Sequence, residues 1–297
     1  MSILSKLSHL LKDPPPEYAF ELSEAGIAWA RLGAHPEVGF QPIEKGVISV
    51  SPLRDNVLQP DALTARARLI APGNGVRRPR RAALILPDYS ARVSVLDFDS
   101  FPSDPAEQLS LVRFRIKKTV PFDVESAAVS FHPHTVAHGG KRVEVVAAVV
   151  ALEVVARFEA AFRAAGFQTG MVTVSSLAAL ALAPADGMCV LVRISGNTLT
   201  VSVLNRGHLR LLRCVELDGV NLDEILGILH PTFAYIEDEL KAKPGAMLAC
   251  GFGPMAEEMT QRAQSDFGLA MEPLRSRFGA PGQENAGLLG YLETVED

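Results

Sequence analysis

The chain has 297 residues, of which 48% are hydrophobic and 21% are charged, and its formal net charge is −5. This length predicts two domains of ordinary size, and the apolar content is sufficient for folded cores, which excludes disorder over most of the chain. The negative charge argues against a dedicated nucleic-acid-binding protein, because affinity for a phosphate backbone depends on clustered Lys and Arg.

The first segment, residues 1–16, combines an apolar stripe with a run of prolines. The stripe recurs at helical spacing and consists of Ile3, Leu4, Leu7, Leu10 and Leu11. The prolines at positions 14–16 would end a helix and form a stiff spacer. We expect this segment either to pack on its own domain or to dock on a partner or a membrane surface. No run in the sequence resembles a membrane span or a signal peptide, so a cytoplasmic location is expected.

The first half of the chain opens with a predicted β-hairpin at residues 18–32, where two apolar strands flank the turn Ser23-Glu24-Ala25. Helix signals follow at Asp104, an N-cap acid before Pro105, and at Gly166, which would end a helix. The further expected elements are an extended piece at 46–50, helices at 60–69, 104–119, 153–165 and 177–183, and strands at 81–87, 91–97, 124–133, 141–151 and 170–174. This order indicates a mixed α/β domain.

The second half repeats the same beginning. A second hairpin is predicted at residues 189–204, and its recurrence indicates a duplicated fold. The turn residues at 184–187 mark the boundary, which predicts a first domain at 17–184 and a second at 185–297. The further expected elements are helices at 223–230 and 231–241, a strand at 246–250, a glycine turn at 251–253, a helix to 267 with a short strand after it, and a last helix from Gln283.

Cysteines and histidines give little sign of a functional site. Cys189, Cys214 and Cys250 lie in apolar runs and are expected to be buried thiols in a reducing compartment. His132, His134 and His138 are candidate zinc ligands by residue type, but solvated histidines at a hairpin end are the simpler interpretation. No metal site is therefore predicted.

Three stretches, in this order, carry a family resemblance. Residues 117–126 contain Pro121-Phe122 at a passage from helix to strand, residues 145–167 form a strand, a helix and a glycine stop, and residues 286–291 begin a closing helix with small residues. Together they resemble the PilM family of type IV pilus assembly proteins, relatives of the division protein FtsA. The resemblance implies an α/β actin-like ATPase fold of the ribonuclease H-like type, with two duplicated domains and a small subdomain inserted at about residues 88–141.

The resemblance also implies a nucleotide cleft, and the sequence departs from the family pattern there. The residues that correspond to the cleft are Glu21, Ser23, Arg193, Gly196, Gly251 and Gly253. In active actin-like ATPases an acid on each hairpin strand orders magnesium, whereas Arg193 replaces the second acid here. Glu24 in the first turn would repel a phosphate, and Phe252 would crowd the adenosine site.

We therefore expect no catalytic residue and no cofactor. The alternatives are that ATP with Mg²⁺ still binds, or that Arg193 and Gly196 hold a phosphate without metal.

The family resemblance implies a scaffold of type IV pilus or related secretion assembly, located at the cytoplasmic face of the inner membrane. Its implied partner is the cytoplasmic N-terminal tail of PilN, an inner-membrane protein, and a homo-oligomer is left open. One alternative is an actin-like ATPase or a sugar-kinase-like phosphotransferase. Another is the cytoplasmic part of a type II secretion protein of the GspL kind, for which a membrane helix would be expected after the last residue.

The inserted subdomain is the expected place for the partner. An extended peptide gains backbone pairing at a sheet edge and fills pockets with alternate side chains. Val112 is expected in a helical wall, with Phe122 and Phe131 as the floor of the groove. Lys117 and Lys118 would steer an acidic tail.

Overall fold

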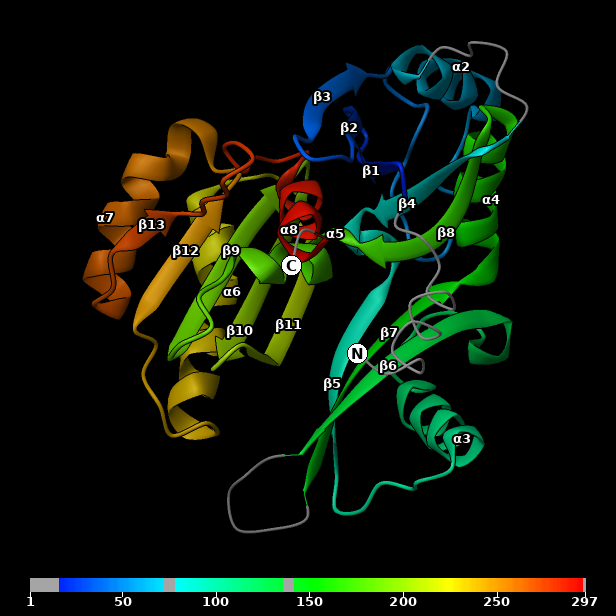
Figure 1. The fold of residues 1–297 in the computed structure, drawn as a ribbon. Coiled ribbons are helices and arrows are strands. Elements are labelled where there is room, and N and C mark those ends of the chain that lie inside the picture. Colours follow the sequence, from blue (N-terminus) through cyan, green and yellow to red (C-terminus); the bar gives the residue numbers. More distant parts are fainter. Residues whose placement is uncertain (1–15, 72–77, 136–141, 296–297) are drawn as a thin grey trace, which may run out of the picture.

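The computed structural model describes residues 16–71, 78–135 and 142–295. The described strands form two five-stranded sheets and one three-stranded sheet. The two large sheets lie on either side of a central boundary, which we call the seam (Figure 1). The small sheet lies next to the first large sheet, below it in Figure 1. This α/β architecture confirms the fold class expected from the sequence.

The first sheet has the order β3-β2-β1-β4-β8, antiparallel from β3 to β1 and parallel from β1 to β8. Its strands are β1 (Tyr18–Leu22), β2 (Gly26–Arg31), β3 (Glu37–Pro42), β4 (Arg80–Leu86) and β8 (Phe167–Val174). The predicted hairpin is β1–β2. The structure has β3 in place of the extended piece expected at 46–50, where Ile48 forms only an isolated bridge with Val57.

The second sheet repeats this topology. Its order is β11-β10-β9-β12-β13, again with an antiparallel part followed by parallel strands. Its strands are β9 (Met188–Ser195), β10 (Thr198–Asn205), β11 (His208–Glu216), β12 (Ala246–Cys250) and β13 (Met271–Pro273). Strand for strand, the two orders are the same, so the duplication predicted from the two hairpins is present in the fold.

The small sheet has the order β5-β7-β6 and is antiparallel. It consists of β5 (Arg92–Phe98), β6 (Ala127–Thr135) and β7 (Val143–Ala151), with helix α3 (Pro105–Ile116) packed against it. The sequence placed the end of this subdomain at about residue 141. Because β7 is the central strand of the small sheet, the subdomain continues to its end at Ala151.

Local sequence signals explain several helix boundaries. The Asp104 carboxylate accepts hydrogen bonds from the backbone N–H groups of Ala106 and Glu107, at 3.0 and 2.9 Å, and so caps α3. Gly166 follows α4 with a φ of 93°, a left-handed conformation that favours glycine. The described helices are α2 (Pro60–Ile70), α3, α4 (Leu152–Ala164), α5 (Ser175–Ala179), α6 (Leu222–Asp238), α7 (Ala256–Phe267) and α8 (Ala286–Val295), with short 3₁₀ turns at Asp88–Ser90, Val124–Ser126, Leu180–Leu182 and Gly253–Met255.

The two helices expected on either side of Pro231 are a single helix, α6. Proline removes one N–H and crowds the carbonyl four residues earlier, which is that of Gly227. Both residues are exposed, so water can bind that carbonyl. The hydroxyl of Thr232 donates to the carbonyl of Ile228 at 2.8 Å, which gives the adjacent turn an additional bond. The prediction of a break at Pro231 was therefore wrong.

Alternation along the central strands places different residues on the two faces of each sheet. In β1, Phe20 and Leu22 face α2 and α4, whereas Ala19 belongs to the cluster that packs against α8. In β9, Val190 and Val192 join the core with α6 and α7, whereas Cys189 and Leu191 pack toward the seam. The side facing the seam is where the two halves meet.

Helices α5 and α8 fill this seam and pack tightly against each other (Figure 1). A Cβ atom at Gly290 would lie 2.2 Å from the carbonyl oxygen of Ala178, so only glycine permits this approach. Leu288 and Leu292 of α8 are buried against the first sheet. The sequence assigned all residues after 185 to the second domain, but this last helix returns to the first.

Candidate functional site

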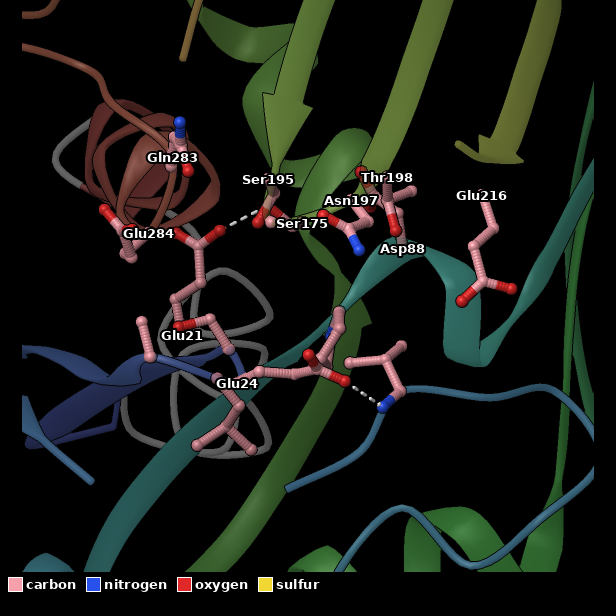
Figure 2. Close-up of a pocket in the computed structure, with 16 residues that line it drawn as sticks. Glu21, Glu24, Asp88, Ser175, Ser195, Asn197, Thr198, Glu216, Gln283 and Glu284 are labelled. Atoms are coloured by element: carbon pink, nitrogen blue, oxygen red, sulfur yellow. Dashed lines mark hydrogen bonds between the residues drawn. The ribbon is translucent and has the colours of Figure 1, made fainter. Parts of the chain in front are cut away.

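A polar cleft lies between the turns of the two hairpins, at the edge of the seam (Figure 2). Its first wall comes from the β1–β2 turn, and its second from the β9–β10 turn. The polar side chains that line it are Glu21, Ser23, Glu24, Asp88, Ser175, Ser195, Asn197, Thr198, Glu216, Gln283 and Glu284. This is the place that the sequence assigned to a nucleotide, although every ionisable side chain in the described lining is an acid.

Strand alternation turns Glu21 and Arg193 toward each other beneath this cleft. Glu21 follows Ala19 at a spacing of two and shares its face of the first sheet, and Arg193 follows Cys189 and Leu191 in the same way on the second. Both faces point to the seam. The two side chains are only 2% and 3% exposed, and Arg193 Nη2 lies 3.8 Å from Glu21 Oε1.

Arg193 joins the second half to three groups of the first. Its Nη2 donates to Ser175 Oγ at 2.6 Å, and its Nη1 lies 3.4 Å from Asp88 Oδ2. Ser175 in turn donates its hydroxyl to Glu21 Oε1. The guanidinium thus lies among two carboxylates and one hydroxyl, within a buried ionic network.

The rest of the network satisfies the two carboxylates. Glu21 Oε2 accepts the backbone N–H of Leu288 at 2.6 Å, and Asp88 accepts the backbone N–H of Ser176. Asp88 Oδ2 also accepts the hydroxyl of Thr200 at 3.0 Å. The groups that contact the buried charges of Glu21, Asp88 and Arg193 therefore come from several elements: β1, α5, β10, α8 and the turn after β4.

Burial controls the electrostatics of this network. Burial raises the pKa of Glu21 to about 7, and Arg193 together with the hydrogen bonds from Ser175 and Leu288 offsets only part of that effect. Burial alone would lower the pKa of Arg193, but Asp88, Cys250 and Glu21 hold it above its ordinary value. Arg193 is therefore a permanent cation in the seam.

The cleft offers the phosphates of a nucleotide no cationic side chain among its described lining residues. Glu21, Glu24, Asp88, Glu216 and Glu284 line it, and no Lys or Arg is among its lining residues in the described part of the chain. A phosphate chain bound without a metal ion would meet these carboxylates with no compensating side-chain cation. Arg193 lies below them and is already engaged by two carboxylates.

The two turns that would approach phosphates are built differently. Ser23 closes the first turn on itself, because its hydroxyl donates to the carbonyl of Gly26 at 3.2 Å and accepts the Gly26 N–H at 3.1 Å. Glu24 accepts the N–H of Val50 at 2.8 Å. In the second turn Gly196 has a φ of 54°, which favours glycine. Neither Ser23 nor Glu24 is therefore arranged to receive an anion.

Gly251 and Gly253 lie apart from this cleft, along a groove between β12, β13 and α7. A Cβ atom at Gly251 would lie 2.1 Å from the carbonyl oxygen of Ile194, so the close approach of β12 to β9 explains this glycine. Phe252 was expected to intrude into a nucleotide site. It is 4% exposed and packs in the core of the second half, where it also borders the groove that contains Gly251 and Gly253.

Sequence reasoning missed Asp88 and Ser175, which complete the network. Each residue follows directly or closely on the carboxyl end of a parallel strand, Asp88 after β4 and Ser175 after β8. Carboxyl ends of parallel strands meet at one edge of a sheet, and polar residues there commonly form a site. That signal was available in the sequence.

The expected partner-binding residues do not share one surface. Val112 is fully buried in the core of the small subdomain, so it does not form the wall of a groove. Phe122 and Phe131 are half-buried against the same core, and Phe131 lines a pocket beside His132 and His134. Lys117 and Lys118 are exposed at the end of α3.

A different groove lies between the small sheet and the first large sheet. We call it the edge groove, because β6 and β8 are edge strands in the two sheet orders. One wall consists of Ala128, Val129 and Ser130 on β6, and the other of Val172, Thr173 and Val174 on β8. Its other lining residues are Leu86, Ala91, Ala148, Val149, Val150, Val155 and Leu177. The edge groove contains no ionisable side chain among these residues.

The histidines and cysteines form no metal centre in the described part of the chain, where no group of three such ligands is gathered. His134 instead stacks on His208 of β11, with ring centroids 3.5 Å apart, and burial lowers the pKa of His134. His138 lies outside the described residues. Cys189 and Cys250 are buried free thiols as expected, whereas Cys214 is partly exposed at the residue level.

No protein-family model matches the sequence, and no curated protein matches it. Solved structures do match. A PilM-PilN type IV pilus biogenesis complex superposes with a TM-score of 0.76 at 17% identity, over 96% of this chain and 100% of that one. An actin-like ATPase fold protein of unknown function from Bacteroides thetaiotaomicron gives a TM-score of 0.54 at 10% identity, over 92% and 93%.

The cytoplasmic domain of EpsL, an inner-membrane component of the type II secretion system of Vibrio cholerae, gives a TM-score of 0.52 at 14% identity, over 94% of each chain. At such identities the similarity establishes the fold, which is the actin-like ATPase fold that the sequence resemblance implied. Among the described residues, no helix is both long and apolar enough to cross a membrane.

Proposed function

We propose that this chain is a PilM-like scaffold of a type IV pilus or related secretion machine. It holds the cytoplasmic tail of a PilN-like inner-membrane protein as an extended peptide in the edge groove. It acts at the cytoplasmic face of the inner membrane and does not hydrolyse ATP. The proposal rests on the similarity to a PilM-PilN complex over nearly the whole chain, combined with an apolar groove between two strand edges.

The edge groove suits an extended peptide for a physical reason. An edge strand offers N–H and C=O groups that no neighbouring strand in its sheet uses, and an incoming chain can pair with them. The residues between the two edges are aliphatic, so alternate side chains of the peptide would be buried among Val129, Val150 and Val172. Burial of such anchors supplies most of the binding energy in peptide complexes.

The ionic network supports the non-enzymatic part of the proposal. Phosphoryl transfer depends on positioning and on neutralising the charge of the phosphates. Here the only buried cation of the cleft region, among the described residues, is Arg193, and it is already paired with Glu21 and Asp88. The ion pairs of Arg193 therefore hold the two halves of the chain together at the seam.

Calorimetry against a synthetic peptide tests the proposal, the peptide being the cytoplasmic N-terminal tail of the PilN-like protein from the same organism. Val129→Asp places a charge inside the edge groove and should weaken binding at least tenfold, because a buried charge without a partner is costly. Phe114→Asp is the matched control, since Phe114 is 73% exposed on α3 of the same subdomain. Its affinity should equal that of the unmodified chain.

A second variant probes the opposite wall. Val172→Asp changes β8 of the first large sheet and should reproduce the loss seen with Val129→Asp. Unchanged affinity in both groove variants would reject the edge groove as the binding site. Circular dichroism of each variant separates a loss of binding from a loss of folding.

A further inference from the structure

The small subdomain contacts the second half of the chain along strand β11. Strands β5 and β11 lie side by side there (Figure 1). The ring of His134 on β6 stacks on the ring of His208 on β11, with centroids 3.5 Å apart and an interplanar angle of 19°. Beside this stack, Arg210 Nη2 on β11 lies 2.6 Å from Glu144 Oε1 on β7. We call these four residues the histidine contact.

Strand register brings the four side chains together. His134 and Glu144 are direct cross-strand partners in the β6–β7 pairing, so they are neighbours on one face of the small sheet. Arg210 is the extra residue of a β-bulge, where the register of β11 against β10 shifts. A bulge redirects a side chain, and Arg210 here reaches Glu144 of the other sheet. All four residues belong to the described part of the chain, whereas the apolar stripe expected at residues 1–13 lies outside it.

The surroundings of His134 disfavour a positive charge on its ring. Burial, followed by the nearby His208, Arg210 and His132, lowers the pKa of His134. Both acids of this region already have a basic partner, because Glu144 pairs with Arg210 and Asp97 pairs with Arg142 at 3.3 Å. The titratable and charged groups around the histidine contact are His132 on β6, Glu144 on β7, Arg142 just before β7, Asp97 on β5, His208 and Arg210 on β11, and Tyr235 on α6.

Acid should therefore separate the two rings. Neutral imidazoles can stack at this distance, but a proton on each would place two cations against each other and next to Arg210. Because the pKa of His134 is lowered, the closed contact binds fewer protons than the separated rings do. The stabilisation from the contact is therefore complete above the ordinary histidine pKa of about 6.5 and is lost as the pH falls below it.

Strand β6 carries both the histidine contact and one wall of the edge groove. Residues 128–130 line the groove, and His134 lies farther along the same strand in the pocket next to β11. Ser130, Ala148 and Leu177 line both cavities, so the two are adjacent. The opposite wall of the groove is β8, which belongs to the first large sheet. A movement of the small sheet away from β11 would therefore change the position of β6 relative to β8.

We propose that the histidine contact makes the edge groove sensitive to pH, with tight binding of the partner tail while the rings are stacked and weaker binding after acid separates them. This regulation rests on the tail capture proposed above. The closed contact fixes β6 before the tail arrives, so less binding energy is lost in ordering the groove. By reciprocity, binding of the tail should favour the stacked, neutral pair and release protons from it.

Calorimetry with the synthetic tail at about pH 7.5 and about pH 5.5 tests this regulation, because these values lie on either side of the histidine pKa. The double variant His134→Phe with His208→Phe keeps two rings that can stack but removes their titration. The affinity of the unmodified chain should fall about fivefold more than that of this double variant at the lower pH. Titration of the peptide or of Glu21 affects both proteins equally. His35→Phe is the matched control, since His35 is exposed between β2 and β3, and it should behave as the unmodified chain does.

A further variant, His208→Asp, should reverse the sign. Its carboxylate would attract a protonated His134, so affinity at the lower pH should rise relative to the double phenylalanine variant. Circular dichroism shows whether each variant is folded. An equal pH dependence in the unmodified chain and the double variant would overturn this regulation and leave tail capture intact.

Absence of tail binding at both pH values would instead reject tail capture. Hydrogen exchange of β6 without the tail then decides whether the histidine contact responds to acid. At the lower pH the exchange should be faster in the unmodified chain than in the double variant, because the separated rings no longer hold the small sheet. Equal exchange in the two proteins would show that the contact does not respond to acid.

Discussion

The β1–β2 and β9–β10 hairpins have the same topology but opposite charges at corresponding places. Each carries one ionisable residue on the face that meets the seam, Glu21 in β1 and Arg193 in β9. Two acids at these places would attract a divalent metal. One acid and one base at these places form an internal ion pair instead.

The turns of the two hairpins differ as well. The first is closed by the Ser23 side chain and carries Glu24, while the second has Gly196 at its centre. Only the second has an open backbone of the kind that approaches phosphates. The two hairpins therefore differ in their turns as well as in their strands.

The largest expected effect comes from breaking the ion pair. Arg193→Leu leaves Glu21 and Asp88 as buried carboxylates without their cation, which should destabilise the protein by about 3–5 kcal/mol. Urea unfolding followed by circular dichroism measures this loss. Arg275→Leu, at an exposed arginine, should change stability by less than about 0.5 kcal/mol. Equal stabilities for the two variants would mean that the network contributes nothing net.

A smaller effect should follow from removing the charge of Glu21, the partner of Arg193 in the ion pair. Burial raises the pKa of Glu21 from 4.5 to about 7, so the folded state binds a proton that the unfolded state releases between these values. The resulting contribution to stability is complete below pH 4.5 and is lost as the pH rises through 7, by roughly 3 kcal/mol at most.

The variant Glu21→Gln should flatten this part of the pH profile, which thermal unfolding at several pH values would measure. Glu216→Gln removes an exposed acid of the same cleft and should leave the profile unchanged. A wild-type profile that rises between pH 5 and pH 7 relative to Glu21→Gln would contradict the assigned direction.

The smallest expected effect is none at all, and it concerns Mg-ATP. A protein with an intact nucleotide site is stabilised by its ligand through mass action. Because the cleft is lined by carboxylates and Arg193 is already paired, Mg-ATP should neither raise the melting temperature nor be hydrolysed. Steady hydrolysis that Glu21→Ala abolishes would show that the first half has kept its metal-ordering role.

Much of this architecture was readable from local patterns. Hairpins β1–β2 and β9–β10 follow from apolar strands around short polar turns, and the start of α3 follows from Asp104-Pro105. Strand β3 was missed because it contains Gly39 and Pro42, which strands disfavour, and its pairing with β2 supplies the missing stability. The break expected at Pro231 failed because the carbonyl that proline displaces lies on the exposed side of α6.

The candidate site, like the fold, was only partly predictable from the sequence. The sequence determined the duplication, the replacement of an acid by Arg193, and the alternation that turns Glu21 and Arg193 toward one side of their strands. Only the tertiary structure decided that Asp88 and Ser175 join them, and that α8 returns to the first half to supply the N–H of Leu288. It also decided that Val112 is buried in the core of the small subdomain and that the edge groove forms elsewhere. The physical reason is that alternation and capping act between near neighbours in the chain, whereas burial and ion pairing depend on which distant segments meet.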